Sequence, residues 1–134
     1  MPSVETEIWE ALRTRIKALP LPLPIAMPGS IYELGDGEWL AVGRATQPPR
    51  RILIAGGPHE RIGTLTLAHC APLGRDSSWY EQRAGLIAAH FPEDLLLPFG
   101  SVTVRVREAP HVQDGYRDGG WWRTPVAIRW ACFA

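Results

Sequence analysis

The last third of the chain holds two strong strand signals, which constrain its fold more than any other feature. Residues 101–108 read SVTVRVRE, where valines alternate with polar residues. This period of two predicts a strand with one buried face. Residues 124–133 read TPVAIRWACF and are apolar on nearly every residue. A strand that is apolar on both faces needs cover on both faces, and in a short chain part of that cover can come from another molecule.

A charged loop joins these two strands and ends in paired tryptophans. Its Asp-Gly steps are typical of turns, while tryptophan and arginine are enriched at protein interfaces. We therefore predict that the loop 113–122 projects and that this part of the chain contacts other proteins. A competing interpretation is that Trp121 and Trp122 only pin the loop onto their own domain. The predicted interface residues are Arg105, Arg107, Asp114, Tyr116, Arg117, Asp118, Trp121, Trp122, Arg123 and Arg129.

The size and charge of the chain suit a subunit of an assembly. Its 134 residues fit one domain. The 14 basic and 14 acidic residues give a formal net charge of zero, so the chain lacks the basic excess expected of a nucleic-acid-binding domain. Zero net charge also removes the repulsion that keeps free monomers apart.

No motif in the chain predicts catalysis, a metal or a cofactor. The four histidines show no metal-ligand spacing, and no phosphate-binding loop or nucleophile signature is present. Cys70 and Cys132 are predicted to be small buried residues. The acidic N-terminus differs from a signal peptide, and no apolar run approaches the length of a membrane span. We expect synthesis in the cytoplasm and no membrane partner.

Two amphipathic helices are predicted, one at each end of a region rich in short strands. The first covers residues 3–19 and ends at Pro20. Prolines then hold residues 20–29 in an extended connector. The second helix covers residues 78–91 and begins at a capping box whose first residue is Ser78.

Short strand signals fill the chain between the connector and the second helix. They are separated by Gly- and Pro-rich turns, which favours a meander of antiparallel strands. The expected extended segments are 31–34, 38–44, 51–55 and 61–70. We therefore predict a single α+β domain, with residues 30–134 forming the sheet and the second helix. The predicted architecture has two layers: an antiparallel or mixed sheet of about four to six strands, with both helices on one face.

Several segments are similar to those of small phage tail proteins. They read RIGTLTL from Arg61, APLGR from Ala71, HFP from His90, SVTVRV from Ser101 and WWRTPVAIRW from Trp121. From about Arg51 to Phe133, the chain resembles the tail terminators, or minor tail proteins, of long-tailed phages and phage-like particles. The N-terminal helix agrees with this resemblance.

The resemblance implies a structural protein of the virion. Tail terminators are α+β subunits that form a hexameric ring. The ring caps the tail tube and then meets the head–neck proteins. The implied partners are therefore further copies of the chain, the tail tube protein and a head–tail connector or neck protein. No catalytic residue or cofactor comes with this family.

Two other readings remain open from the sequence. One is a different neck component, such as a head–tail adaptor or the tube protein itself. The other is a small-molecule-binding module or enzyme with a pocket between the sheet and the helices.

Overall fold

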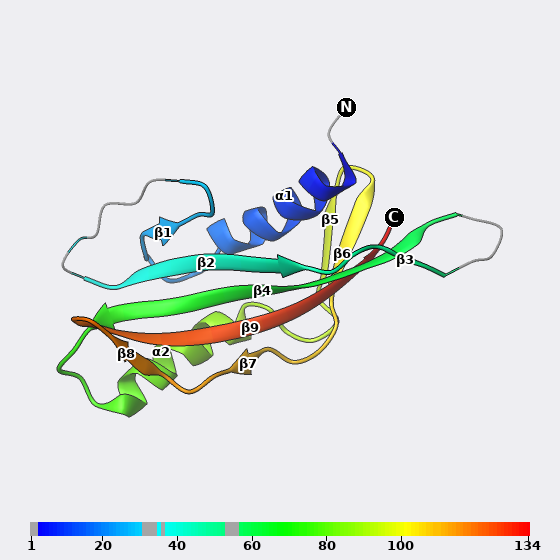
Figure 1. Ribbon diagram of the computed structural model, residues 1–134. Helices are drawn as coiled ribbons and strands as arrows, with labels where there is room; N and C mark the ends of the chain where they lie inside the picture. The colour runs from blue at the N-terminus through cyan, green and yellow to red at the C-terminus, as the bar shows by residue number, and fades with distance from the viewer. Residues whose placement is uncertain (1–2, 31–34, 36, 53–56) are drawn as a thin grey trace.

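A computed structural model describes residues 3–30, 35, 37–52 and 57–134. The expected extended stretch at 31–34 and the second part of the expected strand 51–55 lie outside these residues. Figure 1 shows two helices and a strongly curved sheet. The elements are α1 (Val4–Lys17), β1 (Ile25–Ala26), β2 (Trp39–Thr46), β3 (Arg50–Arg51), β4 (His59–Pro72), α2 (Ser77–Ala89), β5 (Leu96–Phe99), β6 (Val102–Val106), β7 (His111–Val112), β8 (Tyr116–Asp118) and β9 (Trp121–Phe133).

The sheet of the described residues has nine strands and curls into a half-barrel (Figure 1). Its main order is β1-β2-β4-β9-β6-β5; β3 pairs with β4, and β7 and β8 pair with β9. Only β1 runs parallel to its neighbour, β2. The prediction of a two-layer sheet with about four to six strands is therefore wrong in strand number and shape. The added strands are too short to carry a periodic signal, and long twisted strands curl a sheet.

The pairing of β4 with β9 sets the two faces of the sheet. It runs from Glu60 opposite Phe133 to Pro72 opposite Trp121. Side chains alternate between faces along a strand, so Leu65 and its partner Ile128 lie on the inner, concave face, where both are fully buried. The outer face carries mainly small side chains and arginines. It is half-buried or exposed along much of β9, so this strand has less cover than its apolar sequence predicts.

The N-terminal caps of the two helices differ. At α1, the Ser3 hydroxyl accepts a hydrogen bond from the Thr6 N–H at 3.1 Å, as expected of an N-cap. At α2, the N-cap residue is Asp76, whose backbone is extended. The Ser78 hydroxyl donates to the Asp76 carboxylate. The predicted capping box starting at Ser78 is therefore wrong, because that residue already lies inside the first turn.

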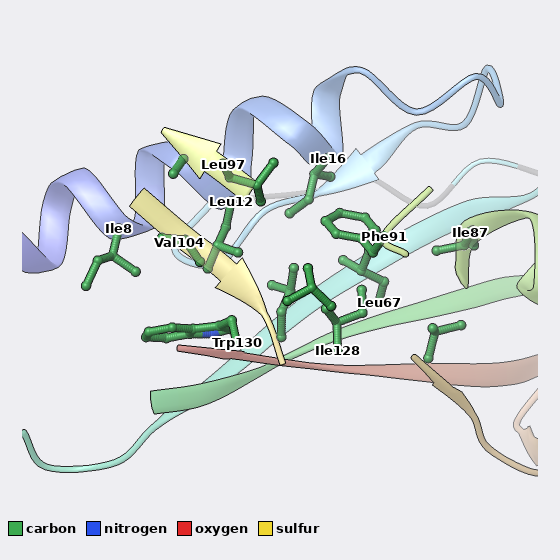
Figure 2. Packing of buried hydrophobic residues seen from close by; sticks show 14 of the residues in the cluster. Ile8, Leu12, Ile16, Leu67, Ile87, Phe91, Leu97, Val104, Ile128 and Trp130 are labelled. Carbon is green, nitrogen blue, oxygen red and sulfur yellow. The ribbon is translucent and has the colours of Figure 1, made fainter. Parts of the chain in front are cut away.

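One core holds both helices against the inner face of the sheet (Figure 2). Each fully buried Leu, Ile or Phe contributes about 1.5–3 kcal/mol relative to an exposed side chain. The largest contributors from the helical segments are Leu12, Ile16, Ile87 and Phe91, and from the sheet Leu40, Leu65, Leu67, Val104, Val126 and Ile128. This shared core fixes both helices relative to β4 and β9.

A buried carboxylate ties α1 to the β5–β6 hairpin. Glu7 accepts hydrogen bonds from the Ser101 N–H at 2.8 Å and the Ser101 hydroxyl at 2.7 Å. Gly100, beside it, has a φ of +57°, a backbone conformation that residues other than glycine rarely adopt. These hydrogen bonds therefore hold the hairpin turn against the first turns of α1.

Gly63 makes room for a tryptophan on the inner face of β9. It lies opposite Trp130. A Cβ at this position would stand 2.6 Å from Cζ2 of Trp130 and 2.8 Å from the carbonyl oxygen of Ala45. Neither atom is at the end of a flexible side chain, so the close packing of β2, β4 and β9 requires glycine here.

We expect Gly63→Ala to lower the free energy of unfolding by about 1–3 kcal/mol, as other overpacked cores do. Urea denaturation measures the change. Gly43→Ala is a matched control, because its Cβ would meet nothing within 4 Å, and we expect it to change stability by less than about 0.5 kcal/mol. Equal effects of the two substitutions would contradict this account of the packing.

Candidate protein-interaction surface

Aromatic side chains gather where β4 ends and β9 begins. The register brings them together, because Pro72 lies opposite Trp121 and Cys70 opposite both Trp39 and Arg123. The loop that follows β4 leads into α2, which adds Trp79 and Tyr80. We call this region the tryptophan end; it comprises Trp39, Trp79, Tyr80, Trp121, Trp122 and the strand β8. In Figure 1 it lies at the end of the sheet marked by β8 and the start of β9.

Trp121 and Trp122 pack on opposite faces of β9. The Trp121 ring meets the Trp39 ring edge-on, with 6.0 Å between centroids. The Trp122 ring lies 5.7 Å from the ring of Tyr80, and Gly115 packs against its Nε1. Both tryptophans are half-buried. This geometry matches the interpretation in which they pin the loop, and it leaves only part of each ring open to a partner.

The polar side chains of the loop extend around these rings. Arg123 pairs with Asp118 at 3.2 Å and lies 5.6 Å from the Trp39 ring centroid. The Arg117 side chain donates to the Gly119 carbonyl at 3.0 Å. Asp114 and Tyr116 are exposed. The structure therefore brings the predicted residues between 114 and 123 together at the tryptophan end.

The other three predicted residues lie away from that end. Arg105 is opposite Ala131 in the β6–β9 pairing and bonds Asp94 at 3.0 Å. The Arg107 N–H donates to the carbonyl of Arg129, placing these two arginines side by side further along β9. The predicted set thus forms two groups.

A partly buried network of an ion pair and a histidine behind the tryptophan end was not predicted. Nε2 of the fully buried His69 lies 2.8 Å from a Glu38 oxygen. Arg83 donates to both oxygens of the same carboxylate, at 2.7 and 3.0 Å. Trp79 covers the network, with its ring 5.8 Å from the ring of His69. The three polar residues are far apart in sequence, so no local spacing signals them.

The pKa values of His69 and Glu38 both lie below their usual values. Burial lowers the pKa of His69, and the nearby Glu38 carboxylate offsets this only in part. Burial alone would raise the pKa of Glu38, but hydrogen bonds from Arg83 and His69 outweigh it, so its pKa lies below the usual value. At neutral pH a neutral histidine and an ionised carboxylate therefore share the site.

Among the described residues, neither the surface hollows nor the titratable side chains form a recognisable reaction centre. An open hollow of about 360 Å³ lies between Glu38, Trp79 and the loop after β4. Within these residues no three His, Cys, Asp or Glu side chains gather as metal ligands do. Burial raises the pKa of the Cys70 thiol to about 11, so it is not a thiolate at neutral pH. No described helix is long and apolar enough to cross a membrane.

We expect stability to fall as the pH drops from 7.5 to 5.5. A histidine whose pKa is lowered on folding contributes stability that is present above its unfolded pKa, near 6.5, and lost as the pH falls through its folded pKa. His90 has a pKa lowered in the same way. Each such group changes the unfolding free energy by at most about 1.4 kcal/mol per pH unit.

Urea denaturation at several pH values measures the slope of the unfolding free energy against pH. His69→Gln should flatten it without abolishing it, because His90 still titrates. His111→Gln is the control, since that side chain is exposed and we expect it to keep the wild-type slope. If the His69→Gln variant loses unfolding free energy with falling pH as steeply as the wild type, the attribution of this loss to His69 is wrong.

Comparisons with known proteins agree with this fold. A solved structure of a protein that carries no functional name superposes with a TM-score of 0.81, at 21% sequence identity, and covers 98% of this chain and 96% of that one. At this identity the likeness shows the fold alone. No curated protein sequence matches the chain significantly.

A comparison with protein families shows which family the chain belongs to. The family of phage tail terminator proteins matches residues 7–130, which includes most of α1, all of α2 and most of β9. These are structural proteins of the phage tail, not enzymes. Because the match covers nearly the whole chain, this protein belongs to the phage tail terminator family.

Proposed function

We propose that the protein forms a ring that caps the phage tail tube and joins it to the head–neck region. The family match over residues 7–130 carries this proposal. The ring would consist of six identical subunits in the tail of the virion. Its partners would be the tail tube protein and a head–tail connector or neck protein.

The uncovered outer face of the sheet supports an assembly role. Both helices share the core on the inner face. A smaller cluster around Trp39 and Cys70 covers one end of the outer face of β2, β4 and β9, and the middle of that face is left to solvent or to a partner. Small side chains make its centre flat, and many are half-buried or exposed: Ala41, Gly43, Ala45, Thr64, Thr66, Pro125 and Ala127. Arg105 and Arg129 border this area and are partly exposed. A flat face with a charged border is suited to contact another protein.

The tryptophan end supplies a second contact surface in the proposed ring. Asp114, Tyr116 and Arg117 project from the loop, while Trp121 and Trp122 hold it in place and offer the open parts of their rings. Aromatic anchors surrounded by charged groups are typical of the centres of interfaces. All the residues predicted from the sequence remain in the proposed interface, in the two groups that the structure defines.

We expect Trp121→Ala combined with Trp122→Ala to impair ring formation and to give tails of irregular length. Native mass spectrometry measures the ring, and electron microscopy of particles made with the variant measures tail length. Circular dichroism checks that the variant is folded. Trp9→Ala is the matched control, because Trp9 is also half-buried but lies on α1.

Tyr116→Ala tests the same surface with a smaller effect on the fold. Its side chain is 49% exposed, so its removal should leave stability within about 0.5 kcal/mol of wild type while weakening the ring. Normal rings and normal tail lengths in both sets of variants would rule out the tryptophan end as an interface.

A further inference from the structure

Two buried polar atoms behind the tryptophan end have no hydrogen-bond partner among the described residues. They are Nδ1 of His69 and the hydroxyl oxygen of Thr124. Both side chains belong to residues that are fully buried. Buried polar atoms are nearly always hydrogen-bonded, either to the protein or to an ordered water molecule. This pair of atoms therefore points to a partner inside the domain.

The strand register brings the two residues together. His69 on β4 lies opposite Thr124 on β9, and directly opposed side chains share a face of the sheet, with their Cβ atoms about 4.5–5.5 Å apart. Side chains alternate along a strand, so this face is the inner one, which also carries the buried pair Leu67 and Val126. The two atoms therefore belong to one site.

The known hydrogen bonds of His69 decide which atom accepts and which donates. Nε2 of His69 lies 2.8 Å from an oxygen of Glu38, and an ionised carboxylate only accepts hydrogen bonds. Nε2 therefore carries the proton of the neutral imidazole, and Nδ1 is an acceptor. The hydroxyl of Thr124 can donate and accept. The two atoms are complementary, although no hydrogen bond joins them directly.

The groups around this site shield it from bulk solvent. The backbone of Gly115 covers Thr124: a Cβ at this glycine would stand 3.1 Å from the Thr124 hydroxyl oxygen and would also collide with Nε1 of Trp122. The ring of Trp79 packs against the ring of His69, with 5.8 Å between centroids. A partner of the two atoms must therefore be small and polar, and water is the molecule that such buried sites hold.

We propose that one buried water molecule bridges Nδ1 of His69 and the hydroxyl of Thr124. The water donates to Nδ1 and accepts from the hydroxyl. It extends the hydrogen bonds that already run from Arg83 through Glu38 to His69. The extended network joins α2 and β4 to β9, two residues beyond Trp122, and so holds the start of β9 from inside the domain. This inference does not depend on the proposed ring.

A high-resolution crystal structure of the wild-type chain tests the site directly. We expect an ordered water molecule at about 2.7–3.2 Å from both Nδ1 of His69 and the hydroxyl oxygen of Thr124. A direct hydrogen bond between the two side chains would overturn the proposal. So would protein atoms that fill the space between them and leave no water there.

Two substitutions separate the hydroxyl of Thr124 from its shape. Thr124→Val removes the hydroxyl and keeps the branched side chain, whereas Thr124→Ser keeps the hydroxyl. We expect the valine variant to lose the water, to shift the nitrogen NMR signal of Nδ1 of His69, and to speed amide hydrogen exchange at 121–124 by at least about tenfold. The serine variant should keep the water and the wild-type signal.

Thr66→Val is the matched control, because Thr66 is a half-buried threonine of β4 on the outer face. It should leave the Nδ1 signal and the exchange at 121–124 unchanged. The His69→Gln variant assigns the signal, since it alone loses the imidazole. A wild-type Nδ1 signal in Thr124→Val, or a signal showing that Nδ1 carries the proton at neutral pH, would overturn the proposed bridge.

Discussion

The rest of the structure depends on the antiparallel pairing of β4 with β9. Their backbones hydrogen-bond from Glu60 opposite Phe133 to Pro72 opposite Trp121, which is nearly the whole length of both strands. This pairing sets which side chains enter the core, because a shift of one residue would turn every side chain to the other face. It also brings the C-terminus beside the start of β4, where His59 and Ala134 exchange backbone hydrogen bonds.

The same pairing separates the surfaces that a structural subunit needs. The inner face holds α1, α2 and the main core, and a smaller buried cluster around Trp39 lies on the outer face. One end of β4 pairs with β3 and the other reaches the tryptophan end. Because β4 and β9 are long and paired along their length, the two ends keep a constant distance and direction.

Side-chain periodicity predicted the elements that carry a long pattern. The alternation in 101–108 and the apolar run in 124–133 correspond to β6 and β9, and the apolar stripe after Ser3 corresponds to α1. The short strands β7 and β8 were missed because pairing with β9, and not their own composition, makes them strands. The curl of the sheet was missed because strand twist accumulates over the whole set of paired strands, which no single segment of the sequence reveals.

The candidate site was predicted in part. Its loop residues were proposed from the sequence because aromatic and charged residues in a glycine-rich turn are a local signal, and their role in an interface stays a prediction. The packing of Trp121 on Trp39 depends on pairing between distant strands, which one sequence does not reveal. The expected strand 51–55 overlaps β3 only at Arg51, and its residues 53–55 lie outside the described part of the chain.

The most direct test of the account is the mass of the wild-type chain in solution, measured by native mass spectrometry over a range of protein concentrations. The proposed ring of six copies of the 14.9 kDa chain predicts growth to one closed assembly of that mass. A chain that remains a monomer at every concentration, or that stops at a symmetric dimer, would contradict the account, because a dimer requires the same surface on both partners.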